Sequence, residues 1–556
     1  MTENKYVLNS NDFSSADYQK VSSVSKDNLK LVQAETNIHD QAFETKPVSY
    51  LRDSFNRFCK NKSSIVAAII ILLIIVYGII APFASSKGYS AKRFSEFKNG
   101  FRDPYFKNVS PYLGIFKNTG FWDGTTKETV SESVYYTYKF DDSNHKVITQ
   151  EVSTSTNLLS KSTMYIIRRD TYAVGNKLIN VSKDEYNALV NYEKEKGIYQ
   201  TDNSIMKPLV DSKTYIETYT QSLLDKNVAS TIVNEIKGQL ENYYNQNASA
   251  YYQMVQVKEG SSNITPLIKN GKLVDIYKKD TNGNNVYFEE IAGNRINIRV
   301  DYFDYFTYKY DMTPYMVFGA NSQGQDIYTR LASGALFSIG LGVVISLINF
   351  VIGLIYGAIS GYYGGTTDLI MERITDIISN VPSVIILTIC QIQFTNNIDL
   401  LSALKSTGVT LLAILVAFVY NGWVGVASTT RMQFYRFKGQ EYVIASRTLG
   451  AKDRRLIFRH ILPNAIGTLV TSSVLMIPGV IFSESSLSYL GIIDFTSSGI
   501  SSIGTLLQEG QNAGLRNFPH VILFPCIVIS LLMICFNLFG NGLRDAFNTS
   551  LKGSEE

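Results

Sequence analysis

The chain alternates long apolar runs with polar stretches, and the apolar runs predict membrane-spanning helices. Residues 64–83 (SIVAAIIILLIIVYGIIAPF) carry no charge and have about the 20 residues that a helix needs to cross a bilayer. Later runs predict further spans at about 336–359, 374–394, 409–426, 466–490 and 521–539. The expected fold class is therefore a polytopic α-helical membrane protein with six transmembrane helices.

Polar and basic segments flank the first span. Residues 1–48 are rich in Ser, Asn and Asp without steady periodicity, which predicts a disordered cytoplasmic tail. Residues 49–63 place apolar side chains at helical spacing among Arg and Lys, which is typical of an amphipathic elbow helix on the inner membrane surface. These basic residues place the N-terminus in the cytoplasm, and six spans return the tail 549–556 to the same side.

The stretch 84–330 is polar but dense in aromatic residues, and it is predicted to be a folded extracellular α+β domain inserted between the first two spans. Ser182 and Glu185 form a capping-box pattern that opens a helix ending at Gly197. A second helix is expected over Thr231–Tyr244.

Asn-Gly pairs at 270–271 and 282–283 predict two hairpin turns in the same domain. No nucleophile–base pair and no metal cluster stands out there. Its histidine, His145, is expected at the surface.

Composition argues against several other functions. The net charge of +4 is small for 556 residues and gives no reason to expect nucleic-acid binding. The cysteines have no CxxC spacing and none lies in the polar insert, which argues against a disulfide framework or a zinc site: Cys59, Cys390, Cys526 and Cys535.

The segment 427–463 is basic and is predicted to be a cytoplasmic loop inside a membrane core of five helices at 331–548. A first helix can run from Glu441 through Leu449, where Gly450 can cap it in a left-handed conformation. A second helix can run over Lys452–Leu462, with Pro463 marking a new start. This pattern predicts a rigid knuckle that can transmit force to a soluble partner. The simpler interpretation is a basic loop that only sets the topology.

The knuckle resembles the EAA loop of ABC importer permeases through Ala445, Gly450 and Pro463. The flanking stretches Glu441–Val443 and His460–Asn464 are similar, more narrowly, to the dipeptide/oligopeptide/nickel branch. Ile444 and Ser446 depart from the usual Glu and Ala of that loop.

Further blocks resemble the same family, and together the resemblance covers about residues 49–83 and 316–548. The matching positions include Gly319, Gly324, Asp326, Arg330, Gly334 and Ser338, then Asp368, Arg373 and Pro382, and later Glu484, Gly491 and Arg544. Asn321, Gln325 and Asn541 replace charged residues of the family pattern. Some Gram-positive oligopeptide permeases are similar in carrying a large external insert.

The resemblance implies a permease subunit that forms half of a translocation path for oligopeptides. It implies as partners a second, homologous permease subunit, two cytoplasmic ATPase subunits, a lipid-anchored extracellular peptide-binding protein and membrane lipid. The chain has no G-x-x-x-x-G-K-[ST] pattern, so ATP and Mg²⁺ are expected on the ATPase subunits, with no cofactor and no enzymatic activity on this chain. The insert is expected to dock the binding protein or to shape the substrate entrance, and otherwise to be a packing or shielding domain.

The expected ATPase-coupling residues all lie in the knuckle: Glu441, Tyr442, Ala445, Gly450, Ala451, Asp453, Arg454, Arg455, His460 and Pro463. Glu484, Ser488 and Asn537 are candidates for contact with the pore or the partner subunit. For Glu484, a place at a helix end in the outer interface is an equal alternative.

Two other functions remain open at this stage. A permease for nickel or another small solute would share the loop, but the spans hold few metal ligands. A membrane-anchored receptor would use the insert to sense a ligand without transport.

Overall fold

The computed structural model describes residues 50–87, 103–156, 163–246, 253–257, 264–269, 272–396, 406–493, 495 and 500–547. The chain forms two compact units, Met1–Arg57 and Phe58–Glu556. The predicted tails at 1–48 and 549–556 lie outside the described residues. Helix α2 (Tyr50–Lys60) falls in the range predicted for the elbow helix.

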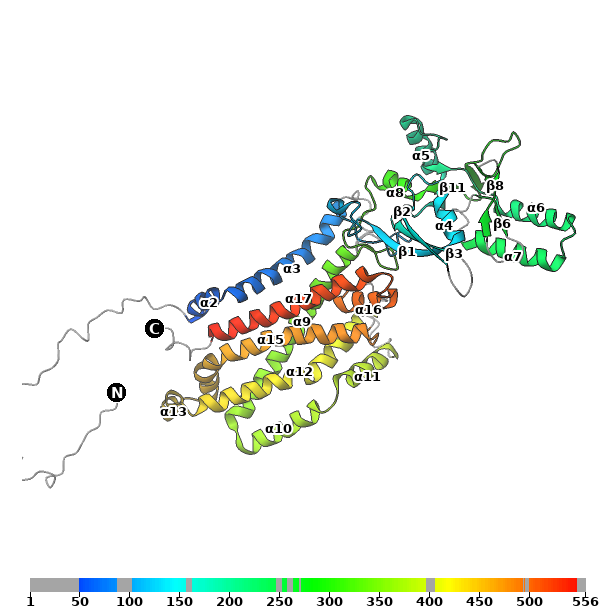
Figure 1. Ribbon diagram of the computed structural model, residues 1–556. Coiled ribbons are helices and arrows are strands. Elements are labelled where there is room, and N and C mark those ends of the chain that lie inside the picture. The colour runs from blue at the N-terminus through cyan, green and yellow to red at the C-terminus, as the bar shows by residue number, and fades with distance from the viewer. Residues whose placement is uncertain are drawn as a thin grey trace, which may run out of the picture. The chain divides into compact units, whose positions relative to one another are not determined.

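Among the described residues, five helices are long and apolar enough to cross a membrane: α3 (Lys62–Lys87), α9 (Ile327–Tyr363), α12 (Ser406–Lys438), α15 (Leu462–Tyr489) and α17 (Pro519–Phe547). A sixth span is formed if the bent pair α10 (Gly365–Ser379) and α11 (Ser383–Asn396) counts as one. The chain is thus a polytopic α-helical membrane protein. Figure 1 shows these helices side by side, and α9 contacts α3, α12 and α15.

The region predicted as the third span, about 374–394, is broken in the structure. The chain bends by 70° between α10 and α11. Pro382 lies in the break, where it cannot donate a backbone hydrogen bond and disfavours a helical conformation at Val381.

Other boundaries also differ from the expected ones. Helix α12 continues to Lys438, so the first third of the predicted loop 427–463 is helical. A short helix, α16 (Ile503–Ala513), was not expected; Ser502 caps it through a reciprocal capping box with Thr505.

Close packing of α9 on α12 depends on glycine. Gly353, Gly357 and Gly361 recur every four residues on α9, and a Cβ added at any of them would lie 2.2–2.7 Å from a carbonyl oxygen of α12. Small residues at this spacing let two helix backbones approach closely.

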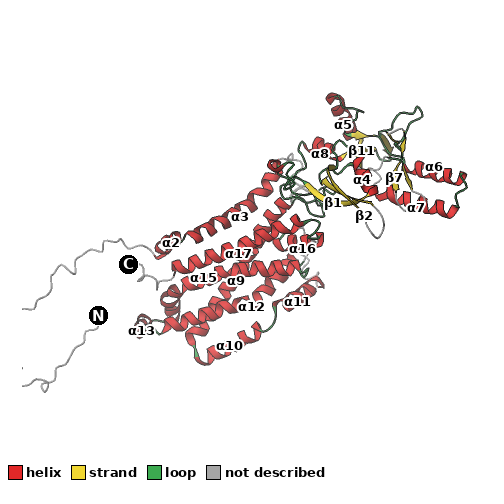
Figure 2. Cartoon of the chain, in the orientation of Figure 1, coloured by secondary structure: helices red, strands yellow, loops and turns green. Residues whose placement is uncertain are grey.

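The region between α3 and α9 mixes helices and strands (Figure 2). One antiparallel sheet has the order β1–β3–β2, made of β1 (Thr125–Ser131), β3 (Thr163–Asp170) and β2 (Ile148–Thr156). A second has the order β10–β11–β4, made of β10 (Phe288–Ile291), β11 (Arg295–Asp301) and β4 (Asn176–Ser182), with β5 (Met206–Lys207) also paired to β11. Two strand pairs follow: β6 (Val255–Val257) with β7 (Ile264–Pro266), and β8 (Ile268–Lys269) with β9 (Lys272–Leu273).

The helices of this region are α4 (Glu132–Lys139), α5 (Lys183–Lys196), α6 (Ser212–Asp225), α7 (Ser230–Gln246) and α8 (Tyr302–Tyr310), with a 3-10 turn η3 (Gly114–Phe116). The helix ends predicted from local sequence signals are confirmed here. Ser182 caps α5 by accepting from the Glu185 N–H, and Gly197 ends it at φ +70°. Helix α7 matches the second expected helix, and β8 and β9 pair across residues 270–271, which lie outside the described residues.

The main core of the insert is aromatic. Phe106, Tyr172 and Phe306 are fully buried within it and pack with the inner face of β11. This core explains why so polar a stretch folds.

Candidate coupling site and its supports

The knuckle begins with helix α13 (Glu441–Thr448), and Gly450 ends it in a Schellman motif. Gly450 has φ +83°, the Ala451 N–H donates to the Ser446 carbonyl, and the Gly450 N–H donates to the Arg447 carbonyl. Glycine is favoured here because a side chain would strain this conformation. The turn sets the direction in which the chain leaves α13.

The second half of the knuckle is continuous with the fifth span. Helix α14 (Asp453–Arg455) passes through a π-helical turn, η4 (Leu456–Ile461), directly into α15. Pro463 lies in the first turn of α15, where its missing N–H costs little. Pro463 thus lies at the start of a helix, as expected, but the π-helical turn joins this helix to α14 without a break.

A small apolar core fixes the knuckle to the helical bundle. Val443, Leu456 and Ile461 are fully buried, and they pack with Tyr362 of α9 and Phe434 of α12. Helix α13 is therefore packed against α9, α12 and the π-helical turn that leads into α15.

The outer face of the knuckle is apolar and basic. Leu449 is 89% exposed and Phe458 is 62% exposed, although both are large apolar side chains. Beside them, Lys452, Arg454 and Arg455 line an open hollow of about 580 Å³ together with Gly450, Ala451, Phe458 and Arg459. Exposed apolar groups with a cationic rim are typical of a protein-binding surface.

The predicted coupling residues divide into exposed and anchored groups. Glu441, Ala445, Arg454 and Arg455 are exposed, as is the ring of Pro463, and Ala451 and His460 are half-buried. Asp453 instead accepts a hydrogen bond from the Tyr362 hydroxyl at 2.6 Å. Tyr442 accepts one from Asn464 at 3.0 Å. These two bonds tie the knuckle to α9 and α15.

An ion-pair cluster joins α9, α10 and α12, and it was not predicted from the sequence. Arg431 of α12 contacts both carboxylate oxygens of Asp368 on α10, and it also contacts Glu372 at 3.1 Å. Tyr435 donates to Asp368 at 2.7 Å, and Ser360 of α9 donates to it as well. The sequence does show an acid, Asp368, and a base, Arg431, but no pattern near either residue indicates that they pair.

Glu484 lies inside the bundle. Its side chain is 1% exposed, and it accepts hydrogen bonds from Ser338 of α9 at 3.2 Å and Ser488 at 3.0 Å. Ser338 also accepts from the N–H of Ile503 at the start of α16. In this conformation Glu484 and Ser488 face the interior of their own chain and join α9, α15 and α16. Asn537, by contrast, is exposed on α17.

Hydrogen bonds and an ion pair join the start of α9 to α16. Asp326 caps α9 by accepting from the N–H groups of Tyr328 and Thr329. Arg330 makes two bonds to Glu509 of α16, at 2.6 and 2.8 Å, and Asn321 donates to the same carboxylate at 2.8 Å. Asn321 thus donates a hydrogen bond to Glu509, at a position where the family pattern has an acid.

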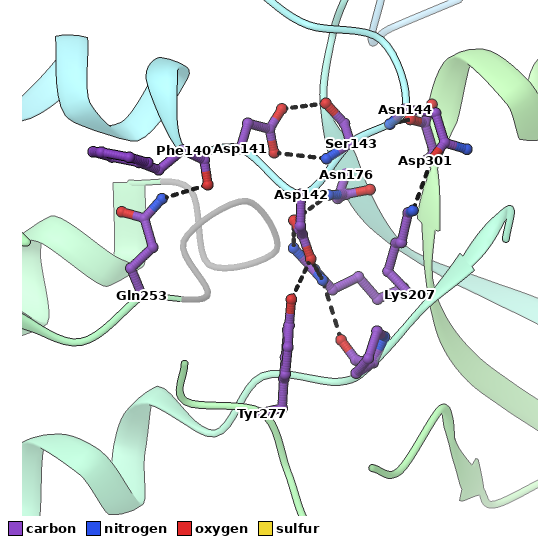
Figure 3. Close-up of polar contacts among 12 residues, drawn as sticks. Phe140, Asp141, Asp142, Ser143, Asn144, Asn176, Lys207, Gln253, Tyr277 and Asp301 are labelled. Carbon is purple, nitrogen blue, oxygen red and sulfur yellow. Dashed lines mark hydrogen bonds and ion pairs between the residues drawn. The ribbon is translucent and has the colours of Figure 1, made fainter. Parts of the chain in front are cut away.

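A second polar cluster lies in the insert (Figure 3). Arg299 of β11 is 1% exposed and binds both oxygens of Asp142, at 2.6 and 2.7 Å. Tyr277 and Asn176 donate to the same carboxylate at 2.8 and 2.6 Å. Four donor atoms therefore compensate one buried acid, as a buried charge requires.

The neighbouring residues of this loop reach other parts of the insert. The Phe140 carbonyl accepts from Gln253 at 3.0 Å, and Asn144 accepts from Lys207 at 2.8 Å (Figure 3). Asp141 is buried and bonds to Ser143, and burial raises the pKa of Asp141 to about 6. The loop 140–144 thus joins the second sheet to the segment before β6.

His145, Asp301 and Asp304 lie close enough to hold a metal ion, with ligand atoms within 4.8 Å of one another. The oxygens of Asp301, however, already accept from the N–H groups of Asn144, Phe303 and Asp304. The ring of His145 lies 3.9 Å from that of Phe303, and His145, which was expected at the surface, is partly exposed, with 36% of its side chain accessible. The geometry supports a structural role for this group.

Known families match both ends of the chain. The binding-protein-dependent transport system inner membrane component matches residues 350–553, and the N-terminal TM domain of oligopeptide transport permease C matches residues 49–106.

Curated relatives agree with these matches. The oligopeptide transport system permease protein OppC of Bacillus subtilis is 39% identical over 235 residues, which are 42% of this chain and 72% of the relative. The dipeptide transport system permease protein DppC of the same organism is 37% identical, over 42% of this chain and 69% of the relative. OppC of Escherichia coli is 34% identical, over 43% and 74%.

Among solved structures, the inward-facing MetNI methionine ABC transporter is similar at 17% identity and a TM-score of 0.32, over 39% of this chain and 96% of the other. The sequence matches carry the assignment, because they cover most of the relatives' length and both ends of the membrane part. This chain belongs to the binding-protein-dependent ABC importer permeases, in the branch of the oligopeptide and dipeptide permeases.

Proposed function

We propose that this chain forms half of the translocation path of an importer for oligopeptides, and that separate ATPase subunits drive it through the knuckle at Glu441–Pro463. The observation that carries the proposal is the knuckle itself, which is fixed inside by Val443, Leu456 and Ile461 and apolar and basic outside. The substrate class follows the names of the similar permeases, which transport oligopeptides or dipeptides.

In this mechanism the exposed Leu449 and Phe458 enter a groove on an ATPase subunit, and Arg454 and Arg455 meet acidic groups at its rim. ATP and Mg²⁺ bind to the ATPase pair, and closure of that pair moves the knuckle. Because α14 runs through the π-helical turn into α15, the span moves with it as a rigid body.

The other partners follow from the same arrangement. A second, homologous permease subunit completes the path, with Asn537 on its contact face. Both termini lie in the cytoplasm and residues 84–330 outside, where the insert docks a lipid-anchored peptide-binding protein. Glu484 and Ser488 act within the subunit, by joining α16 to α9 and α15.

The first test is to purify the tagged full-length chain from its native membrane under gentle conditions and to identify what accompanies it. We expect two ATPases, a second permease and a peptide-binding lipoprotein, and peptide uptake by the reconstituted complex that requires ATP. Recovery of the chain alone after cross-linking would favour a receptor, and uptake of Ni²⁺ in place of peptide would favour a nickel permease.

A pair of variants tests the knuckle directly. Leu449→Asp places a charge on the most exposed apolar side chain of the knuckle and should abolish recovery of the ATPases. Leu178→Asp is the matched control, because Leu178 is 50% exposed on β4 in the insert. Equal ATPase recovery with both variants would contradict the proposed interface.

A further inference from the structure

Residues 114–122, which we call the aromatic loop, contain two large apolar side chains that are unusually exposed. Ile115 is 83% exposed and Phe121 is 61% exposed, more than any other large apolar side chain described within residues 103–317. An exposed apolar pair of this kind marks an interaction surface or a membrane contact.

The aromatic loop is held in a defined shape. The Leu113 N–H donates to the Trp122 carbonyl at 2.7 Å, and the Gly120 N–H donates to Asp123 at 2.7 Å. The Thr119 hydroxyl lies 2.7 and 2.9 Å from the carbonyls of Phe116 and Phe121. Trp122 itself has φ +55°, which is uncommon for a bulky residue. The exposure of Ile115 and Phe121 is therefore built into the loop.

The inner side of the loop continues into a band of rings at the ends of three spans. Trp122 donates its indole N–H to the Val317 carbonyl, and its ring lies 5.4 Å from Phe524 of α17. Phe318 stacks on Phe524 at 4.1 Å and lies 5.3 Å from Tyr328 of α9. Tyr77 of α3 lies 5.0 Å from Tyr328. Aromatic rings gather in this way where a membrane protein crosses from lipid to water.

The charge of the aromatic loop also suits the boundary between lipid and water. Its sequence, GIFKNTGFW, has Lys117 as its one charged residue and no acid. Lysine beside an apolar surface can keep its ammonium group among lipid phosphates while its stem lies in the apolar region.

We propose that the aromatic loop dips into the lipid headgroup layer, on the side of the membrane that carries residues 103–317, with Ile115 and Phe121 in contact with lipid. The occupant is lipid because Trp122 extends the band of rings that joins α3, α9 and α17. The loop would anchor the insert to the bilayer surface, whatever the transported substrate is.

The test places one fluorescent probe on the loop. In the full-length chain with its four native cysteines replaced by serine, Ile115→Cys is labelled with the dye NBD and reconstituted in nanodiscs of palmitoyl-oleoyl phosphatidylcholine. Ile232→Cys is the matched control, because Ile232 is 51% exposed on α7, whose buried residues pack in a different core, with Val255 and Ile276.

We expect doxyl-labelled phosphatidylcholine to quench the probe at 115 and not at 232. Dithionite should bleach the probe at 115 at least about tenfold more slowly, since an apolar face inserted about 5–10 Å deep is shielded from a charged reagent. Equal bleaching at both positions would overturn the proposal. Protection at 115 only when the second permease subunit or a binding protein is added would also overturn it, in favour of a protein contact.

A second measurement avoids the cysteine replacements. The chain has two tryptophans, so Trp423→Phe leaves Trp122 as the only one. We expect phosphatidylcholine brominated at carbons 6 and 7 to quench Trp122 more than aqueous iodide does. Quenching by iodide alone would overturn the proposal.

Discussion

One ion pair in the insert, between Arg299 and Asp142, joins the loop 140–144 to β11. Arg299 and Asp142 form a nearly buried pair, and Tyr277 and Asn176 complete the hydrogen bonds of the carboxylate. Removing only Arg299 would leave a mostly buried carboxylate without its cation, which costs up to about 3–5 kcal/mol. The pair is thus better understood as a means of fixing one arrangement of the loop 140–144 than as a net source of stability.

Asp141, next in the chain, should make this loop sensitive to pH. Its pKa is about 6 in the folded chain because of burial, against a usual value of 3.8. Between these values the folded chain binds more protons than the open one, so the free energy of opening falls as the pH rises, by about 1–2 kcal/mol from pH 5 to pH 7.5.

Asp141→Asn removes this titration and should remove the pH dependence. The measurement is hydrogen exchange of peptides covering 141–146, corrected for the intrinsic effect of pH on exchange. Asp225→Asn, at the exposed end of α6, should leave the dependence as it is in the unaltered chain. A dependence that survives Asp141→Asn would refute the assignment.

At the scale of elements, the turn at Gly450 decides the shape of the knuckle. Gly450 and Gly439 both have open space where a Cβ would lie, but only Gly450 among these two has a positive φ, at +83°. Gly450→Ala should therefore cost about 1 kcal/mol through backbone strain, whereas Gly439→Ala should be close to neutral. We expect a several-fold loss of ATP-driven uptake for the first variant with normal membrane insertion, measured in proteoliposomes. Equal uptake by both variants would show that the turn does not limit coupling.

The contact between α9 and α12 gives a second prediction at this scale. Gly357→Ala puts a Cβ 2.2 Å from the Ala427 carbonyl, so the two helices must separate. Gly340→Ala, on the same helix with nothing within 4 Å, is the control. The thermal midpoint of the detergent-solubilised chain should fall by several degrees for Gly357→Ala alone, for a loss of about 1–3 kcal/mol. An unchanged midpoint would mean that the interface is loose.

Elements with strong local signals could be predicted from the sequence, and those that depend on distant partners could not. The cap at Ser182 and the turn at Gly450 follow from a few adjacent residues. The pairing of Arg431 with Asp368 joins residues 63 apart, and nothing near either one indicates the other. Helix α16 packs on α15 and α17, and it did have local signals that were missed: the Ser502 cap, and Ile503, Leu506 and Leu507 at helical spacing.

At the scale of the whole molecule, the insert can be removed without disturbing the membrane part, because backbone hydrogen bonds join the segment 103–112 at its beginning to the segment 316–324 at its end. The Asp103 N–H donates to the Gly324 carbonyl and the Asn108 N–H to the Asn321 carbonyl, both at 2.9 Å. The Tyr112 N–H donates to the Met316 carbonyl, also at 2.9 Å. The chain can therefore be cut after Tyr112 and rejoined before Met316 without pulling the spans apart.

Replacing residues 113–315 by a short Gly-Ser linker should separate two partner contacts. If the insert docks the peptide-binding protein, the shortened chain loses that protein but still recovers the ATPases, because the knuckle core of Val443, Leu456 and Ile461 is untouched. Leu449→Asp should show the opposite pattern, losing the ATPases and keeping the binding protein. Protease protection of the loop 427–463 in oriented vesicles controls for correct insertion of both variants. Binding-protein recovery and peptide uptake that persist in the shortened chain would assign the insert a packing or shielding role, and the docking surface would then have to lie on the short external segments that remain, around α16.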